Sequence, residues 1–188
     1  MTALIEATGL SKHYPVETGG FLRRTTTPLR AMDTVSLTVM EGETPGLVGE
    51  SRCGKSTLGR LLIRLLPATT GTIRFGGADI TTLGAADITT LGGKALREVR
   101  RSMQIIFHDP YGALNPRMTV EDIVMEPLLI HGIRSDADSR ARVTQMLSLV
   151  GLPARARERF PHEFSGGQRQ RIGIARALVL KPRFVVCG

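Results

Sequence analysis

The sequence predicts an α/β fold, in which strands and helices alternate along the chain. Three observations favour this class. Short apolar runs typical of strands alternate with helical patterns, aromatic residues make up only 4% of the chain, and a glycine-rich segment stands between a predicted strand and a predicted helix. An aliphatic core of this kind suits a parallel sheet rich in Val, Ile and Leu. The length of 188 residues is that of one ordinary domain of about 100–200 residues.

The composition excludes several classes of protein. Hydrophobic residues make up 41% and charged residues 22% of the chain, as in folded globular proteins. No run approaches the ~20 apolar residues that cross a bilayer, and the N-terminus lacks the pattern of a secretory signal. Cys53 and Cys187 are too few for a disulfide scaffold or a four-ligand zinc site, so we expect a reducing, cytoplasmic setting.

The formal net charge is +8, from 25 basic and 17 acidic residues. Such a charge attracts nucleic acid, anionic lipid or acidic partners. Local basic clusters lie at 97–101 and 155–159, and no aromatic residues interleave with them. Single-stranded nucleic-acid grooves carry stacking aromatics, so solvated helix faces are the favoured interpretation and no nucleic-acid partner is expected.

The order of elements follows from the hydrophobic pattern. Alternating polar and apolar residues predict a half-buried strand over 34–39, and the apolar run 46–48 predicts a buried one. Apolar residues at helical spacing predict a helix over 57–66. Further strands are expected at 72–75, 103–107 and 183–187.

Helical patterns dominate the stretch 119–165. Thr119 and Asp122 form a capping pair at its start, and the first pattern ends near residue 150. Ser165 caps another predicted helix, which runs to Leu178. Strands on both sides make this stretch a helical insert in the α/β arrangement.

An eight-residue segment is repeated in tandem, at 78–85 and 86–93. Solenoid repeats need about 20–50 residues and at least three copies. We therefore interpret the repeat as a local duplication or a lengthened loop, which a surface connection tolerates.

One glycine-rich segment fits the phosphate-binding pattern G-x-x-x-x-G-K-[ST]. Its glycines allow backbone N–H groups to face phosphate oxygens, Lys55 carries the charge that meets the β- and γ-phosphates, and the Ser56 hydroxyl can bind Mg²⁺. A predicted strand precedes the segment and a predicted helix follows it, as this motif requires. The predicted nucleotide-binding residues here are Gly49, Glu50, Ser51, Arg52, Cys53, Gly54, Lys55, Ser56 and Thr57.

A second candidate anion site lies at the start of the helix that Ser165 caps. Its residues are Ser165, Gly166, Gly167 and Gln168. A capped amphipathic helix would explain the pattern equally well if it stood alone. The motif follows Lys55 by 110 residues, and this pairing favours an anion-binding helix end.

The pair of motifs resembles the ATP-binding cassette (ABC) family, whose signature is a Leu-Ser-Gly-Gly-Gln-like sequence; Phe164 replaces the leading Leu here. Within that family the chain is similar to the oligopeptide and dipeptide importer ATPases. The resemblance covers nearly all of the 188 residues. The segments that carry it are 19–25, 47–51, 109–120 and 161–178.

The resemblance implies a single P-loop NTPase domain of the ABC nucleotide-binding type over 1–188. Such a domain has an antiparallel β subdomain and a helical subdomain, here near 119–165, and its C-terminal part would be missing. The implied function is that of the ATP-binding subunit of a peptide importer, with ATP and Mg²⁺ as cofactors. The implied location is peripheral, on the cytoplasmic face of the bacterial inner membrane.

The same resemblance implies partners. These are membrane-spanning permease subunits, a second ABC ATPase subunit in a homo- or heterodimer, and indirectly a periplasmic peptide-binding protein. In the family, two ATPases enclose two ATP molecules, each held between the phosphate loop of one subunit and the signature of the other. Residues 165–168 would therefore contact ATP bound to the partner, and the loop 108–116 would face the permease.

Other roles follow from matched positions. Tyr14 falls where an aromatic stacks on adenine, although a tyrosine of the core would fit as well. Ser56 would hold Mg²⁺. His108 stands where the family has the Gln that contacts Mg²⁺ and the attacking water. Arg52 replaces a family Gly, and Pro45 a family Leu.

The end of the sequence departs most from the family. Gly188 takes the place of the Walker B Asp, and neither the catalytic Glu nor the switch His is present. Hydrolysis by this chain is therefore doubtful, and a truncated remnant that binds nucleotide without turnover is the alternative. A DNA-repair or chromosome-structure ATPase is a third hypothesis, which the absence of long heptad runs and cysteine pairs disfavours. The solute carried is not encoded in these residues.

Overall fold

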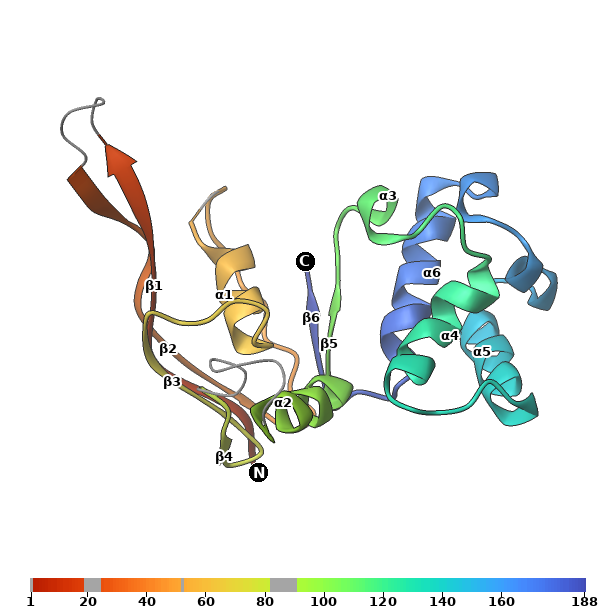
Figure 1. Cartoon of the computed structure of the whole chain (residues 1–188), viewed down its shortest axis with the longest axis horizontal. Helices are drawn as coiled ribbons and strands as arrows, with labels where there is room; N and C mark the ends of the chain where they lie inside the picture. The colour runs from red at the N-terminus through yellow and green to blue at the C-terminus, as the bar shows by residue number, and fades with distance from the viewer. Residues whose placement is uncertain (1, 19–24, 52, 82–90) are drawn as a thin grey trace. The chain divides into compact units, whose positions relative to one another are not determined.

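The computed structural model describes residues 2–18, 25–51, 53–81 and 91–188 (Figure 1). The chain divides into two compact units, Met1–Leu96 and Arg97–Gly188. Among the described residues, no helix is both long and apolar enough to span a membrane.

The N-terminal unit is built on an antiparallel sheet with the strand order β2-β1-β3-β4. Its first two strands form a long ribbon, in which Ala3 pairs with Met40 and Thr18 with Thr25 (Figure 1). The predicted strands 34–39 and 72–75 lie within β2 and β3. The strands are β1 (Ala3–Thr18), β2 (Thr25–Met40), β3 (Thr70–Phe75) and β4 (Ala78–Asp79).

Helix α1 (Lys55–Leu62) is shorter at its C-terminal end than the 57–66 predicted. The chain leaves the helix because Arg64 has a φ of 57°, in the left-handed region that a right-handed helix cannot continue through. Leu58, Leu61 and Leu62 are buried, so this face of the helix holds it in the unit by apolar contact.

The prediction of a buried strand at 46–48 is wrong. No strand is assigned there, and the side chains of Leu47 and Val48 are 56% and 94% exposed. A strand exists only where a neighbouring strand shares its backbone hydrogen bonds. None of the strands among the described residues pairs with this segment.

The C-terminal unit contains a parallel pair of strands and a group of helices (Figure 1). In the pair, Met103 lies opposite Phe184 and Ile106 opposite Cys187, so both predicted strands are confirmed. The elements are α2 (Leu91–Ser102, which contains the boundary between the units), β5 (Met103–Ile106), α3 (Pro110–Ala113), α4 (Val120–Ile130), α5 (Ala137–Leu149), the 3-10 turns η1 (Ala154–Glu158) and η2 (Pro161–Glu163), α6 (Gly166–Leu178) and β6 (Phe184–Cys187).

Apolar side chains of α4, α5 and α6 form the core of this unit. Leu128, Leu147 and Ile172 are completely buried there, one from each helix. The predicted helical stretch up to residue 150 consists of two helices, because Gly132 has a φ of 77° and ends the first of them. The repeat at 78–93 lies largely outside the described residues.

Candidate functional site

The phosphate-loop motif surrounds the N-terminus of α1. Gly54 is the N-cap residue, with a φ of 95° that L side chains rarely adopt. A Cβ placed on Gly54 would lie 3.0 Å from the carbonyl oxygen of Ala31 in β2. Both the left-handed backbone and this close approach therefore call for glycine.

Lys55 turns back over the loop that precedes it. Its Nζ donates hydrogen bonds to the carbonyl oxygens of Gly49 and Glu50, at 2.6 and 2.5 Å, and lies 3.4 Å from the Sγ of Cys53. The partners of the ammonium group are neutral. An anionic phosphate oxygen would bind the same ammonium group more strongly, because both partners would then be charged.

The remaining residues of the loop lie open to solvent or partly so. Glu50, Ser51, Cys53 and Ser56 are exposed, and Thr57 is half-buried. Arg52 lies outside the described residues. The structure thus brings the predicted residues of 49–57, apart from Arg52, to one helix N-terminus with an amino group directed at the loop.

These residues fit a nucleotide phosphate with its magnesium ion. The helix N-terminus offers unpaired N–H groups and a partial positive charge. The first turn of α1 contains no acidic residue that would repel an anion. Ser56 can supply one hard oxygen to Mg²⁺, which usually takes its other ligands from phosphate and water.

Tyr14 lies in β1 of the same unit, opposite Leu29 of β2. Its ring is half-buried, and the Nζ of Lys12 is 5.0 Å from the ring centroid, a cation–π contact. Lys12 also donates to the carbonyl oxygen of Pro67, at 2.9 Å. The sequence does not reveal Lys12 as a neighbour of this ring.

The second motif begins α6 in the C-terminal unit. Ser165 is the N-cap: its hydroxyl accepts from the Gln168 amide at 3.4 Å, and its own amide donates to the Gln168 side chain at 3.0 Å. The predicted capped helix is therefore confirmed. A Cβ on Gly166 or Gly167 would meet no atom within 4 Å, so this helix end is open enough for a ligand to reach the backbone.

His108 is exposed in the segment that follows β5. Among the described residues, no three His, Cys, Asp or Glu side chains gather into a group that could hold a metal ion. The adjacent Phe107 carbonyl accepts a hydrogen bond from the Gln170 side chain of α6, at 3.3 Å. The loop is thus attached to the helix that the second motif begins.

A groove of about 220 Å³ lies beside β5, α4 and α6 in the C-terminal unit. His131 lines it, and burial, followed by the charges of Arg101 and Arg97, lowers the pKa of its ring, against the opposing effect of Glu98. Its wall residues are Gln104, Ile105, Phe107, Glu126, Pro127, Ile130, His131, Arg176, Ala177 and Leu180.

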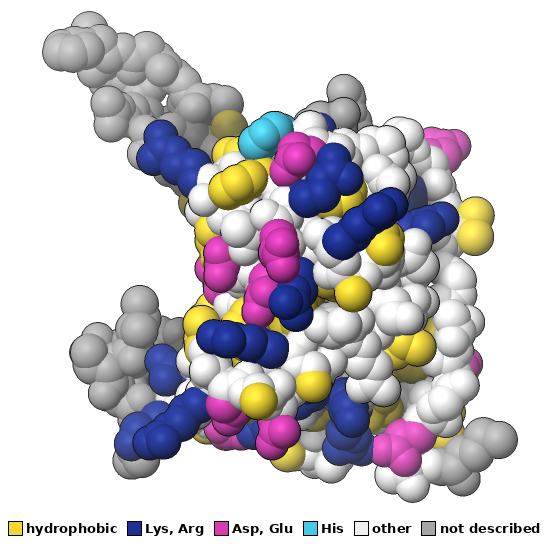
Figure 2. All heavy atoms as spheres, turned by 90° about the vertical axis from the view of Figure 1, so that its right-hand side faces the viewer, with side chains coloured by type: hydrophobic (Ala, Val, Ile, Leu, Met, Phe, Trp, Pro, Cys, Tyr) yellow, Lys and Arg dark blue, Asp and Glu magenta, His cyan; other side chains and the backbone are white. Residues whose placement is uncertain are grey.

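Basic side chains lie among acidic and apolar ones on the face shown in Figure 2. Glu121, for example, lies 3.8 Å from the Nε of Arg140 and 3.6 Å from that of Arg157. Arg157 belongs to the basic cluster 155–159. Part of that cluster's charge is therefore neutralised locally.

The model of the ABC transporter family matches residues 32–187. The chain belongs to the ABC transporter family. A relative from Brucella ovis is 47% identical over 185 residues, which cover 98% of this chain and 53% of the relative. The oligopeptide transport ATP-binding protein AppF of Bacillus subtilis is 43% identical over 183 residues, 97% of this chain and 53% of AppF. The resemblance to peptide importer ATPases is confirmed.

A solved ABC cassette has the same fold. The ATP-binding cassette MJ0796, in a dimeric post-hydrolysis state bound to ADP and Pi, superimposes with a TM-score of 0.77 at 26% identity. The match covers 97% of this chain and 72% of that cassette. The predicted ABC-type fold is thereby confirmed, and the chain spans about half the length of the curated relatives named above.

Proposed function

We propose that these residues bind ATP with Mg²⁺ as part of the ATP-binding subunit of a peptide importer. The observation that carries the proposal is the conjunction of a left-handed Gly54 with Lys55 at an open helix N-terminus. The names of the relatives support the importer class, since AppF is an oligopeptide transport ATP-binding protein.

In this proposal the phosphate loop binds the β- and γ-phosphates. Backbone N–H groups of 49–57 donate to phosphate oxygens, and Lys55 exchanges its carbonyl partners for a phosphate oxygen. Ser56 holds Mg²⁺, which offsets the charge of the phosphates. Tyr14 stacks on adenine with the ring face opposite Lys12, because the ammonium group covers the other face.

The second motif binds the ATP of another subunit. Ser165 and the backbone of 166–168 would meet the γ-phosphate held by a second ABC ATPase, either an identical chain or a related one. The uncrowded Gly166 and Gly167 support this role, because a nucleotide can approach their N–H groups without meeting a side chain.

We propose that the two units are subdomains of one nucleotide-binding domain.

The groove beside α4 and the loop 108–116 are proposed to dock a permease subunit. Phe107 and Ile130 line the groove and are 37% and 59% exposed, which suits an apolar protein segment. In this proposal the chain is a peripheral subunit at the cytoplasmic face of the inner membrane. A periplasmic peptide-binding protein would act through the permease.

ATP hydrolysis is the activity of the family by class, and His108 is the residue proposed at the position that contacts Mg²⁺ and water. Binding without turnover is the alternative, and Gly188 favours it because a Walker B carboxylate is absent at that position. Gly188 donates its amide to the Ile106 carbonyl at 3.0 Å. A Cβ there would lie 3.7 Å from that same oxygen, an ordinary contact, so the backbone has room for Asp.

Calorimetric titration with Mg·ATP tests the proposal. Lys55→Ala removes a charge-assisted contact worth about 1.5–3 kcal/mol, so affinity should fall roughly 10- to 150-fold. Lys94→Ala removes an exposed lysine of α2 and should bind as the parent chain does. Equal affinities of the Lys55→Ala and Lys94→Ala variants would overturn the assignment.

A further inference from the structure

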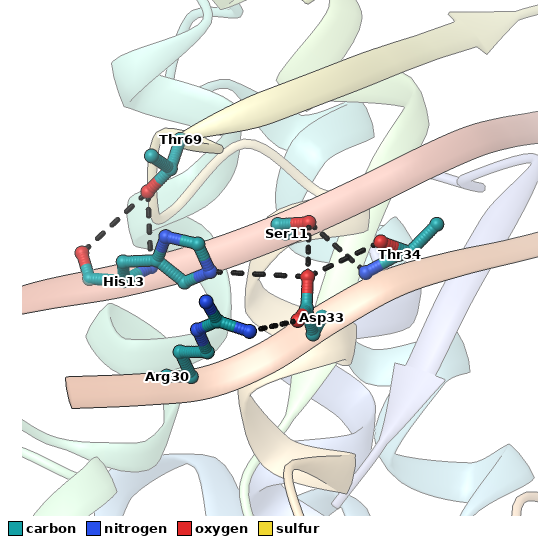
Figure 3. A network of polar contacts seen from close by, with 6 residues as sticks. All are labelled: Ser11, His13, Arg30, Asp33, Thr34 and Thr69. Carbon is teal, nitrogen blue, oxygen red and sulfur yellow. Dashed lines mark hydrogen bonds and ion pairs between the residues drawn. The ribbon is translucent and has the colours of Figure 1, made fainter. Parts of the chain in front are cut away.

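A polar cluster joins β1 and β2 (Figure 3). The Ser11 hydroxyl donates to Oδ1 of Asp33 at 3.3 Å and accepts from the Thr34 amide at 2.9 Å. The Thr34 hydroxyl donates to the same Asp33 oxygen at 3.1 Å. Ser11 is only 3% exposed, so its hydroxyl makes both contacts away from bulk water.

The cluster contains a strained residue. Thr34 has a φ of 48°, a left-handed conformation that a β-branched side chain adopts only under constraint. Ser11 holds the amide of Thr34, and Asp33 holds its hydroxyl. The register of β1 against β2 shifts at the same place, between Leu10 and Lys12. Because a strand bends where its register shifts, the cluster lies at a bend of the ribbon and its hydrogen bonds hold that bend.

Two basic side chains also face Asp33. Nη1 of Arg30 donates to Oδ2 at 3.1 Å, and Nε2 of His13 lies 3.9 Å from Oδ1. The hydrogen bond from Thr34 lowers the pKa of Asp33 most, and the hydrogen bond from Ser11 and the nearby Arg30 and His13 lower it further, against a smaller opposing effect of burial. The carboxylate is therefore charged at neutral pH and bridges both strands.

The bend lies against the phosphate loop. Arg30 and Asp33 flank the dipeptide Ala31–Met32, and this dipeptide packs on Gly54: an added Cβ on Gly54 would lie 3.0 Å from the Ala31 oxygen and 3.9 Å from the Met32 Cβ. Met32 is buried. A change in the bend would thus move the wall against which Gly54 holds its left-handed conformation.

We propose that Asp33 is a positioning residue of the nucleotide site: by holding Thr34 in its left-handed conformation it keeps the Ala31 carbonyl against Gly54. Asp33 reaches the phosphate loop only through this backbone. The role in nucleotide binding rests on the proposed function, whereas the effect on Gly54 does not.

Hydrogen exchange tests the effect on Gly54 without nucleotide. The Leu58 amide donates to the Gly54 carbonyl at 2.8 Å and reports the first turn of α1. In the full 188-residue chain, Asp33→Ala should speed exchange of this amide about tenfold, since it removes contacts to a charged group. Asp79→Ala is the matched control: Asp79 lies in the same sheet and, like Asp33, accepts a hydrogen bond from a nearby threonine, here from the Thr81 amide at 2.8 Å.

A second substitution at Thr34 distinguishes a positioning role of Asp33 from a general contribution to stability. Glycine adopts a φ of 48° without strain, so Thr34→Gly in the Asp33→Ala background should return Leu58 exchange and Mg·ATP affinity to within about twofold of the parent chain. Loss of exposed ion pairs would not be repaired by glycine. Asp33→Asn, which keeps the side-chain shape but removes its charge, is the milder variant and should shift exchange in the same direction.

The outcomes are distinct. Failure of Thr34→Gly to rescue, or an equal effect of Asp79→Ala, overturns the positioning role. Rescued exchange together with rescued Mg·ATP affinity supports it. Rescued exchange in chains that do not bind Mg·ATP at all supports the control of Gly54 by Asp33 and overturns the proposed function instead.

Discussion

The side-chain amide of Gln170 donates to the backbone carbonyl of Phe107, 3.3 Å away and 63 residues earlier in the chain. Gln170 lies in the first half of α6, and Phe107 follows β5 directly. The bond therefore connects the helix that Ser165 caps with the segment that contains His108. A ligand that displaces the start of α6 should therefore also displace the segment that contains His108.

Gln170→Ala should lower the free energy of unfolding by about 1 kcal/mol or less, the net value of one hydrogen bond, here from the half-buried Gln170 side chain. Urea denaturation measures this change. Gln145→Ala, at an exposed position of α5, is the control and should leave the unfolding midpoint unchanged. An equal loss in both variants would mean that the bond to Phe107 is not formed in solution.

Gly54→Ala should destabilise the chain by about 1–2 kcal/mol, because alanine is disfavoured at a φ of 95°. It should also weaken Mg·ATP binding, since its Cβ would push against the Ala31 carbonyl. Gly46→Ala provides the control, because no atom lies within 4 Å of its added Cβ. If Gly54→Ala unfolds at the same denaturant concentration as Gly46→Ala, the left-handed N-cap is not present in solution.

Ser165→Ala removes the capping hydroxyl of α6 and should cost about 1 kcal/mol of stability. Ser148→Ala removes an exposed hydroxyl near the end of α5 and should cost less. Thermal melts followed by circular dichroism compare the two. The interpretation of Ser165 as a cap would be wrong if their melting temperatures coincided.

Stability should fall as the pH falls below about 6.5, the ordinary pKa of histidine. Burial lowers the pKa of His131, so the unfolded chain binds a proton at a pH where the folded chain does not, and protonation favours unfolding. Melting temperatures at pH 7.5 and 5.5 should therefore differ less for His131→Gln than for the parent chain. His162→Gln, a change at an exposed histidine, should retain the full difference.

Local signals in the sequence predicted part of the fold well. The range of α6 was predictable because Ser165 and Gln168 cap it and Lys181–Pro182 follow it. Strand β1 gives a weak pattern, since its register shifts at several places interrupt the alternation of polar and apolar residues. The apolar pattern of 46–48 predicted a strand, but no described strand pairs with this segment.

Some features of the candidate site could be predicted from the sequence and others could not. The phosphate-loop residues form a contiguous motif with its own glycine spacing, so they could be predicted from the sequence alone. The contact of Ala31 with Gly54 and the cation above Tyr14 could not. The first depends on a bend stabilised by side chains of two strands. The second depends on β1, a strand that the sequence pattern did not predict; only within a strand do Lys12 and Tyr14, two residues apart, share one face.

Titration of the ¹⁵N-labelled chain with Mg·ATP, followed by its backbone amide signals, tests the central claim that the phosphate loop binds nucleotide. The largest shifts should fall on amides of 49–57, with Lys55 among them, and Lys55→Ala should require a roughly 10- to 150-fold higher nucleotide concentration to reach the same shifts. A saturating titration that leaves the amides of 49–57 unmoved, or moves only those of another segment, would contradict the account.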